Sequence, residues 1–132
     1  MKNCGEKGHH GFHVHEFSDF SNGCLSAGPH YNPFGVEHGP QNADHLHRHV
    51  GDLGNMTMDS AGNSKGAVID HLVKLQGPYS VVGRSVMIHA DEDDLGYGDN
   101  SKGHIKPPEN GYVSKVTGNA GARIACGEIK LS

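Results

Sequence analysis

The sequence predicts a small all-β protein with long loops, and three features of its composition support this. At 132 residues the chain has room for a single domain, residues 1–132, with a modest core. Only 34% of the residues are hydrophobic, aromatic residues make up 6%, and tryptophan is absent, so that core is small. Twenty glycines and six prolines favour turns and loops over long helices.

Charge and hydropathy argue against several kinds of partner. Lysine and arginine number 11 against 15 aspartates and glutamates, and a net charge of -4 disfavours nucleic acid or an anionic membrane surface. No apolar run approaches the length that crosses a bilayer. Residues 1–8 lack the apolar core of a secretory signal, so we expect a cytoplasmic protein.

We expect strands and loops to alternate along the chain. Two stretches rich in Gly, Pro, Asn and Asp are expected to be long loops, residues 18–48 and 90–121, and loops of such length in a compact domain usually carry function. Residues 66–75 could form a strand running into a turn or a short helix, and their hydrophobic periodicity does not decide between the two. Strands are expected at residues 9–17, 50–57, 81–89 and 122–131.

Histidine is the residue type that departs most from ordinary composition, with 12 in the chain. In the first strand, alternation places His13 and His15 on one face and Phe12 and Val14 on the other. A His-x-His pair on a rigid strand holds two imidazole nitrogens close together and suits copper or zinc. Two ligands do not complete a metal site, so further ligands must come from elsewhere in the chain.

The remaining candidate ligands are spread over both loops and the third strand. Four imidazoles suit copper(II), whereas three imidazoles and a carboxylate suit tetrahedral zinc. By number and type the chain holds enough ligands for two metal sites. The further candidates are His30, His38, His49, Asp52 and His89.

Three cysteines cannot all pair within one chain, and composition alone favours free thiols at Cys4, Cys24 and Cys126 in a cytosolic protein.

Ordered motifs carry a resemblance to a known family. Between about residue 8 and residue 131 the chain resembles the copper/zinc superoxide dismutases. The resemblance implies a Greek-key β-sandwich, or flattened barrel, with two long functional loops. The motifs are His-Gly-Phe-His-Val-His-Glu-Phe, Gly-Cys-x-Ser-Ala-Gly-Pro-His, Arg-His-Val-Gly-Asp-Leu-Gly-Asn, Val-Gly-Arg-Ser, Asp-Asp-Leu-Gly and Gly-Asn-Ala-Gly-x-Arg-x-Ala-Cys-Gly.

Each metal ligand of the family has a matching position. The resemblance implies that His30 is shared between the two metals. It also implies that Asp93 bonds to one copper histidine, His13, and to one zinc histidine, His38. The implied copper ligands are His13, His15, His30 and His89, and the implied zinc ligands are His30, His38, His49 and Asp52.

The resemblance implies further roles outside the ligand set. Arg123 matches the arginine beside the copper. Cys24 and Cys126 match the disulfide of the family, which replaces the free-thiol interpretation for that pair and leaves Cys4 free. A cation in the second loop is expected to attract an anionic substrate, and it is Lys102, Lys106 or Lys115.

The implied activity is disproportionation of superoxide to dioxygen and hydrogen peroxide at copper, with His30 as a proton donor and Arg123 as the anion-binding residue. A copper chaperone is the implied protein partner. The alternative is a non-catalytic copper- and zinc-binding module of the same fold, for metal storage or delivery.

The chain departs from the family at its start, where members have about three further strands. We therefore expect Phe12, Val14 and parts of the segment from Val81 to Ile88 to be exposed. Three explanations stay open: an upstream segment absent from this sequence, a homo-oligomer formed through the exposed face, or a marginally stable fold.

Several residues have a simpler interpretation than metal binding. His10 is expected to bond to backbone, and Met56 and Met58 to pack rather than bind copper(I). A register shift would bring His45 or His47 into the zinc site in place of a neighbour; otherwise both are solvated. Asn55-Met56-Thr57 fits a glycosylation sequon, which matters only in a secreted protein.

Overall fold

The computed structural model describes residues 8–59, 69–96, 116–118 and 120–130. Expectations for residues elsewhere lie outside this part of the chain; they concern Cys4, Lys102, Lys106 and Lys115.

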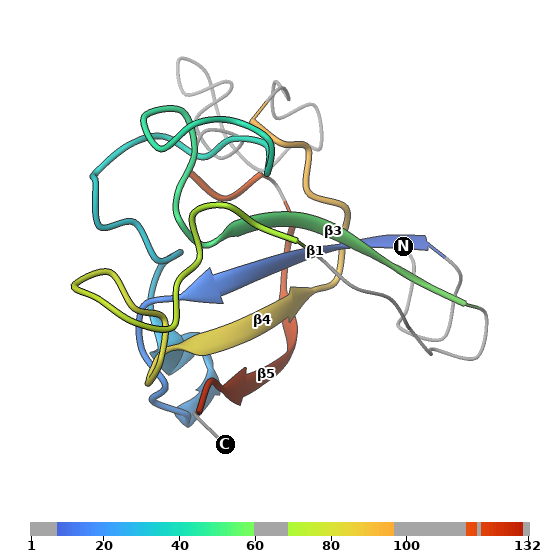
Figure 1. Cartoon of the computed structure of the whole chain (residues 1–132). Helices are drawn as coiled ribbons and strands as arrows, with labels where there is room; N and C mark the ends of the chain where they lie inside the picture. The colour runs from blue at the N-terminus through green and yellow to red at the C-terminus, as the bar shows by residue number, and fades with distance from the viewer. Residues whose placement is uncertain (1–7, 60–68, 97–115, 119, 131–132) are drawn as a thin grey trace, which may run out of the picture.

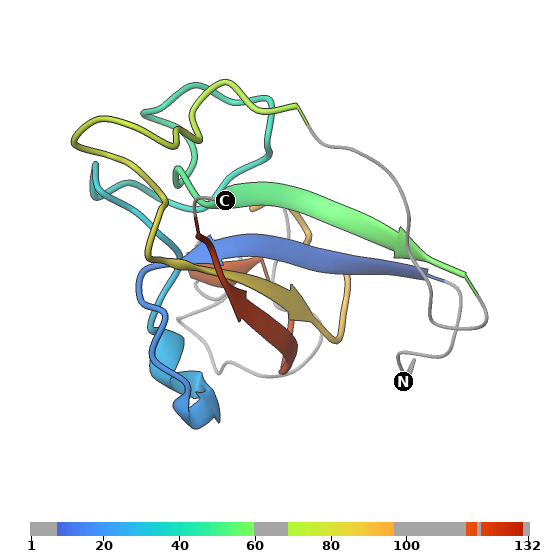
Figure 2. The same ribbon diagram turned by 60° about the horizontal axis from the view of Figure 1, so that its bottom comes forward.

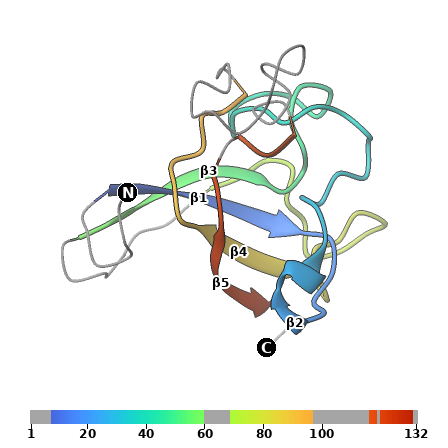
Figure 3. The same ribbon diagram turned by 180° about the vertical axis from the view of Figure 1, so that it is seen from behind.

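An antiparallel sheet forms the framework, as the all-β prediction required. Its order is β3-β1-β4-β5, which places the histidine-bearing strand β1 inside the sheet (Figure 1). A short strand, β2 (Ser21–Cys24), and the 3-10 helix η1 (Leu25–Ala27) lie near β5 (Figure 3). The strands of the sheet are β1 (Gly8–His15), β3 (Asp52–Met58), β4 (Ser85–His89) and β5 (Arg123–Glu128).

The expected elements are present with changed boundaries. The first loop is not wholly irregular, because β2 and η1 lie within it. The third expected strand begins later, at Ser85, because Arg84 N–H bonds to the Val81 carbonyl in a turn. Residues 69–75, the described part of the ambiguous segment, contain neither a helix nor a named strand.

Two β-bulges place polar side chains beside the histidines. In β3 a register shift near Gly54, whose φ is 85°, brings Asp52 opposite His13 of β1. In β5 a second shift brings Arg123 opposite His89 of β4. Bulges redirect side chains locally, so the sheet presents these residues at one site.

Val14 is buried, which corrects the expectation that it would be exposed. It is 1% exposed and packs with Tyr31, Val50 and Val81, which lie outside the strands of the sheet. Loops lie beside the end of β1 (Figure 2). Phe12 and Ile88 are half-buried, so only part of the expected bare face is accessible in the described chain.

Main-chain hydrogen bonds join β1 to the two segments that cover it. Val14 N–H donates to the Gly51 carbonyl at 2.9 Å, Gly51 N–H to the Tyr31 carbonyl at 3.0 Å, and Tyr31 N–H to the Val14 carbonyl at 2.8 Å. A β-carbon at Gly51 would collide with the Val14 carbonyl oxygen. Glycine at position 51 therefore permits this closed arrangement.

Replacing Gly51 by alanine is expected to lower the free energy of unfolding by about 1–3 kcal/mol, the usual cost of overpacking a buried contact. Gly127→Ala is the matched control, because a β-carbon at Gly127 meets nothing within 4 Å. Urea unfolding of both variants tests this expectation, and equal stabilities would contradict it.

Candidate metal centre

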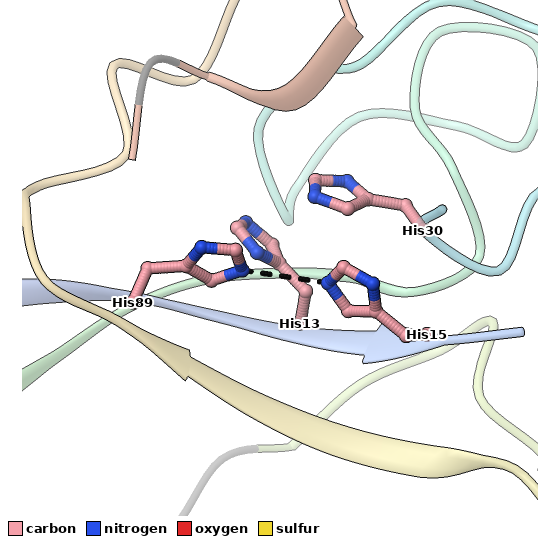
Figure 4. Close-up of side chains that lie close together, drawn as sticks. All are labelled: His13, His15, His30 and His89. Carbon is pink, nitrogen blue, oxygen red and sulfur yellow. Dashed lines mark hydrogen bonds between the residues drawn. The ribbon is translucent and has the colours of Figure 1, made fainter. Parts of the chain in front are cut away.

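Four buried histidines gather over the sheet at the end of β1. Strand β1 supplies His13 and His15, the end of β4 supplies His89, and the loop after η1 supplies His30 (Figure 4). Each offers a ring nitrogen within 4.8 Å of those of the other three. His15 Nε2 lies 3.4 Å from His89 Nε2. The spacing suits a single metal ion bound by four imidazoles.

Three of these imidazoles are oriented through their second nitrogen. His15 Nδ1 bonds to the Gly28 carbonyl at 2.7 Å, and His89 Nδ1 bonds to the Gly121 carbonyl at 3.1 Å. His13 Nε2 bonds to Asp93 Oδ2 at 2.6 Å. Such bonds fix the tautomer and direct the other nitrogen toward a metal.

Within the four-histidine cluster, two buried nitrogens have no hydrogen-bond partner among the described residues. They are His13 Nδ1 and His30 Nε2. An unpaired buried polar atom costs free energy, so its presence points to a partner such as a bound ion. A metal ion would satisfy both atoms, so the donor set fits copper.

A second cluster forms around the carboxylate of Asp52. Its Oδ1 lies 2.9 Å from His30 Nδ1, 2.8 Å from His38 Nδ1 and 3.3 Å from His49 Nδ1. Its Oδ2 accepts the backbone N–H of His49 at 2.7 Å and that of Gly39 at 3.1 Å. Three imidazoles and one carboxylate form the donor set of a tetrahedral zinc site.

Proximity alone admits another fourth member of this cluster. His13 lies with His30, His38 and Asp52 in a group whose ligand atoms are all within 4.8 Å of one another. His49 fits the cluster better, because its Nδ1 faces Asp52 Oδ1 whereas His13 Nε2 is bonded to Asp93.

Burial favours the neutral form of all four histidines in the first cluster. It lowers the pKa of His15 to about 2. It also lowers the pKa values of His13 and His30 well below the ordinary value, and that of His89 less strongly. A neutral imidazole binds metal without first losing a proton.

In contrast, hydrogen bonds favour the charged forms of His38 and Asp52. Burial by itself would lower the pKa of His38, but hydrogen bonds to Asp52 and Asp93 outweigh it and raise this pKa to about 9. Burial would raise the pKa of Asp52, but hydrogen bonds from His30, His38 and His49 hold it well below its usual range. Without metal, His38 therefore carries a proton at neutral pH.

Asp93 joins the two clusters, because it bonds to His13 through Oδ2 and to His38 Nε2 through Oδ1 at 2.7 Å. Asn55 holds the backbone of Asp93 on both sides: its Nδ2 donates to the Asp93 carbonyl at 3.0 Å and its Oδ1 accepts the Asp93 N–H at 2.7 Å. The sequon in which Asn55 lies did not reveal this positioning role.

Gly118 is a second positioning residue that the sequence did not single out. Its φ is 77°, and a β-carbon there would collide with Asp93 Oδ1 and lie 2.6 Å from His38 Nε2. Its place in the Gly-Asn-Ala-Gly motif was the available signal.

Arg123, His10 and Met58 lie outside the two clusters. Arg123 Nη1 donates to the Cys24 carbonyl at 2.9 Å, and Cys24 forms a disulfide with Cys126, as the resemblance implied. His10 Nδ1 bonds to the His89 carbonyl at 3.0 Å, which confirms its structural role. Met58 is 7% exposed and packs in the interior, as expected.

The fold and the site define a β-sheet metalloprotein with two adjoining histidine clusters. The sequence model of the copper/zinc superoxide dismutase family matches residues 2–129. The chain therefore belongs to that family. No helix in the described ranges is long and apolar enough to cross a membrane.

Individual relatives agree with this assignment. "Superoxide dismutase [Cu-Zn]" of Neurospora crassa is 54% identical over 122 residues, covering 92% of this chain and 71% of the relative. "Superoxide dismutase [Cu-Zn] 1" of Debaryomyces hansenii is 56% identical with the same coverage. The crystal structure of the clock protein EA4 superposes with a TM-score of 0.76 at 42% identity, covering 93% of this chain and 70% of the other.

The metal-free protein is expected to be most stable near pH 6.5. Below that pH, buried neutral His15 costs about 1.4 kcal/mol per pH unit, because only the unfolded state takes up the proton. The contribution of His38 is fully present below pH 6.5 and is lost as the pH rises toward about 9. Urea unfolding of chelator-treated protein between pH 4.5 and 9 measures this, and stability rising throughout would contradict it.

Gly118→Ala is expected to weaken zinc binding about 10- to 100-fold, because the new methyl group displaces the bond between Asp93 and His38. Gly83→Ala is the matched control: its φ is 84°, yet a β-carbon there meets nothing within 4 Å. Competition with a chelator gives both affinities. Equal losses would assign the effect to backbone strain alone.

Proposed function

We propose that this protein disproportionates superoxide to dioxygen and hydrogen peroxide. The observation that carries the proposal is the pair of histidine clusters that share His30, with Arg123 opposite His89 in the sheet register. His13, His15, His30 and His89 would hold copper, and His30, His38, His49 and Asp52 would hold zinc. When bound, copper supplies the one-electron redox couple that the two half-reactions need.

His30 is suited to move a proton between the clusters. Its Nδ1 bonds to Asp52 at 2.9 Å, whereas its Nε2 is buried in the four-histidine cluster without a protein partner in the described chain. With Nδ1 held in the Asp52 cluster, where zinc would bind, Nε2 is the nitrogen that would hold a proton and donate it to the reduced substrate.

Arg123 is suited to bind the anionic substrate. Backbone carbonyls of Cys24 and Leu25 accept from its Nη1 at 2.9 and 3.3 Å, so the guanidinium is fixed in place. Burial lowers the pKa of Arg123, but a guanidinium keeps its charge in proteins. A fixed cation beside His89 attracts and orients a small anion.

A non-catalytic binding module is the second candidate, and the same two clusters would serve it. Metal storage needs no anion-binding arginine, so the placement of Arg123 favours the enzyme.

Self-association belongs to the proposal as well. The homo-oligomer would form through the partly accessible sheet face, where Phe12 of β1 pairs with Ile88 of β4 and Ile88 pairs with Ala125 of β5. Phe12 and Ile88 are half-buried and Ala125 is exposed, so they leave apolar surface on this face. A stable homo-oligomer would have to bury about 1,000 Å² or more there. Copper delivery by a chaperone and a cytoplasmic location stay predictions.

Arg123→Ala is expected to slow superoxide consumption about tenfold or more at unchanged copper content, because the fixed cation is lost. Arg123→Lys keeps the charge without the planar fork and should fall between the two. Pulse radiolysis on copper- and zinc-loaded protein measures the rates. Absence of activity in the unaltered protein would favour the binding module.

A further inference from the structure

Three histidines alternate in the loop before β3, and only His49 reaches the buried carboxylate cluster. The His47 side chain is 74% exposed, and its Nδ1 bonds to Asp44 at 2.6 Å. His45 is exposed, with its ring 5.3 Å from that of Phe34. The loop thus holds three imidazoles within five residues, and one of them must be selected for the carboxylate cluster.

Arg48 lies between His47 and His49, and its side chain is fully buried. Its Nε donates to the His49 carbonyl at 2.9 Å and its Nη2 to the Val50 carbonyl at 2.6 Å. Its Nη1 donates to the Gln41 carbonyl at 2.6 Å. One guanidinium therefore binds both ends of this loop.

Asp70 anchors the guanidinium from another segment. Arg48 Nη1 lies 2.6 Å from Asp70 Oδ1, and the carboxylate side chain is 6% exposed. Asp70 Oδ2 also accepts the backbone N–H groups of Leu72 at 2.9 Å and Val73 at 2.8 Å. The ion pair is thereby fixed relative to the fold, and with it the backbone of His49.

We propose that Arg48 is the positioning residue that selects His49, rather than His47, for the zinc site. This inference rests on the zinc site of the proposed function. A shift of two residues would bring His47 to the position of His49 and Leu46 to that of Arg48. Leucine has no donor, so the Asp70 carboxylate and the backbone carbonyls would lose their partners in a buried place.

Cobalt(II) binding to the full-length, zinc-free protein tests the selection through its tetrahedral absorption bands. With Arg48 in place, His49→Ala is expected to weaken Co²⁺ binding about 100-fold, and added imidazole should restore it in the space left empty. His47→Ala is the matched control and should bind as the unaltered protein does. The proposal is overturned if His49→Ala keeps its affinity and loses it only when His47 is also replaced.

Replacing Arg48 tests whether its loss allows His47 to take the place of His49. Arg48→Met/His49→Ala is expected to bind Co²⁺ about tenfold tighter than His49→Ala, and His47→Ala should abolish that gain. Arg48→Lys/His49→Ala repeats the comparison with the charge retained, and circular dichroism verifies folding. A folded double variant without a His47-dependent gain would overturn the proposal. No Co²⁺ binding by the unaltered protein would instead overturn the zinc site itself.

Discussion

The closed set of main-chain hydrogen bonds among Val14, Tyr31 and Gly51 is the constraint on which the site depends. Val14 lies between two histidines of β1, Tyr31 follows His30, and Gly51 precedes Asp52. The bonds are buried and each segment satisfies another, so none of the three can move alone. Backbone geometry therefore brings the residues of both clusters together.

The burial of polar atoms without partners costs free energy that a bound metal ion would offset. Burial keeps the imidazoles of the first cluster neutral, and it leaves His13 Nδ1 and His30 Nε2 without protein partners among the described residues. Because coordination satisfies both nitrogens, metal binding adds to the free energy of folding. The small core makes that contribution important for a chain of this size.

Two carboxylates divide the histidines between the clusters and connect them. Asp52 lies beside the Nδ1 atoms of His30 and His38. Asp93 bonds to His13 through one oxygen and to His38 through the other. Asn55 and the absence of a side chain at Gly118 keep Asp93 in place. Asp93 thus links a histidine of each cluster through one carboxylate.

The all-β class and the His13–His15 pair were predictable from the sequence, because alternation along a strand is a local property, and family motifs supplied the other candidate ligands. The folded chain was needed to see that Val14 is covered, that bulges bring Asp52 and Arg123 to the site, and that Arg48 fixes the loop. These features join segments far apart in the chain. They depend on packing and on the pairing of buried polar groups, which no local pattern records.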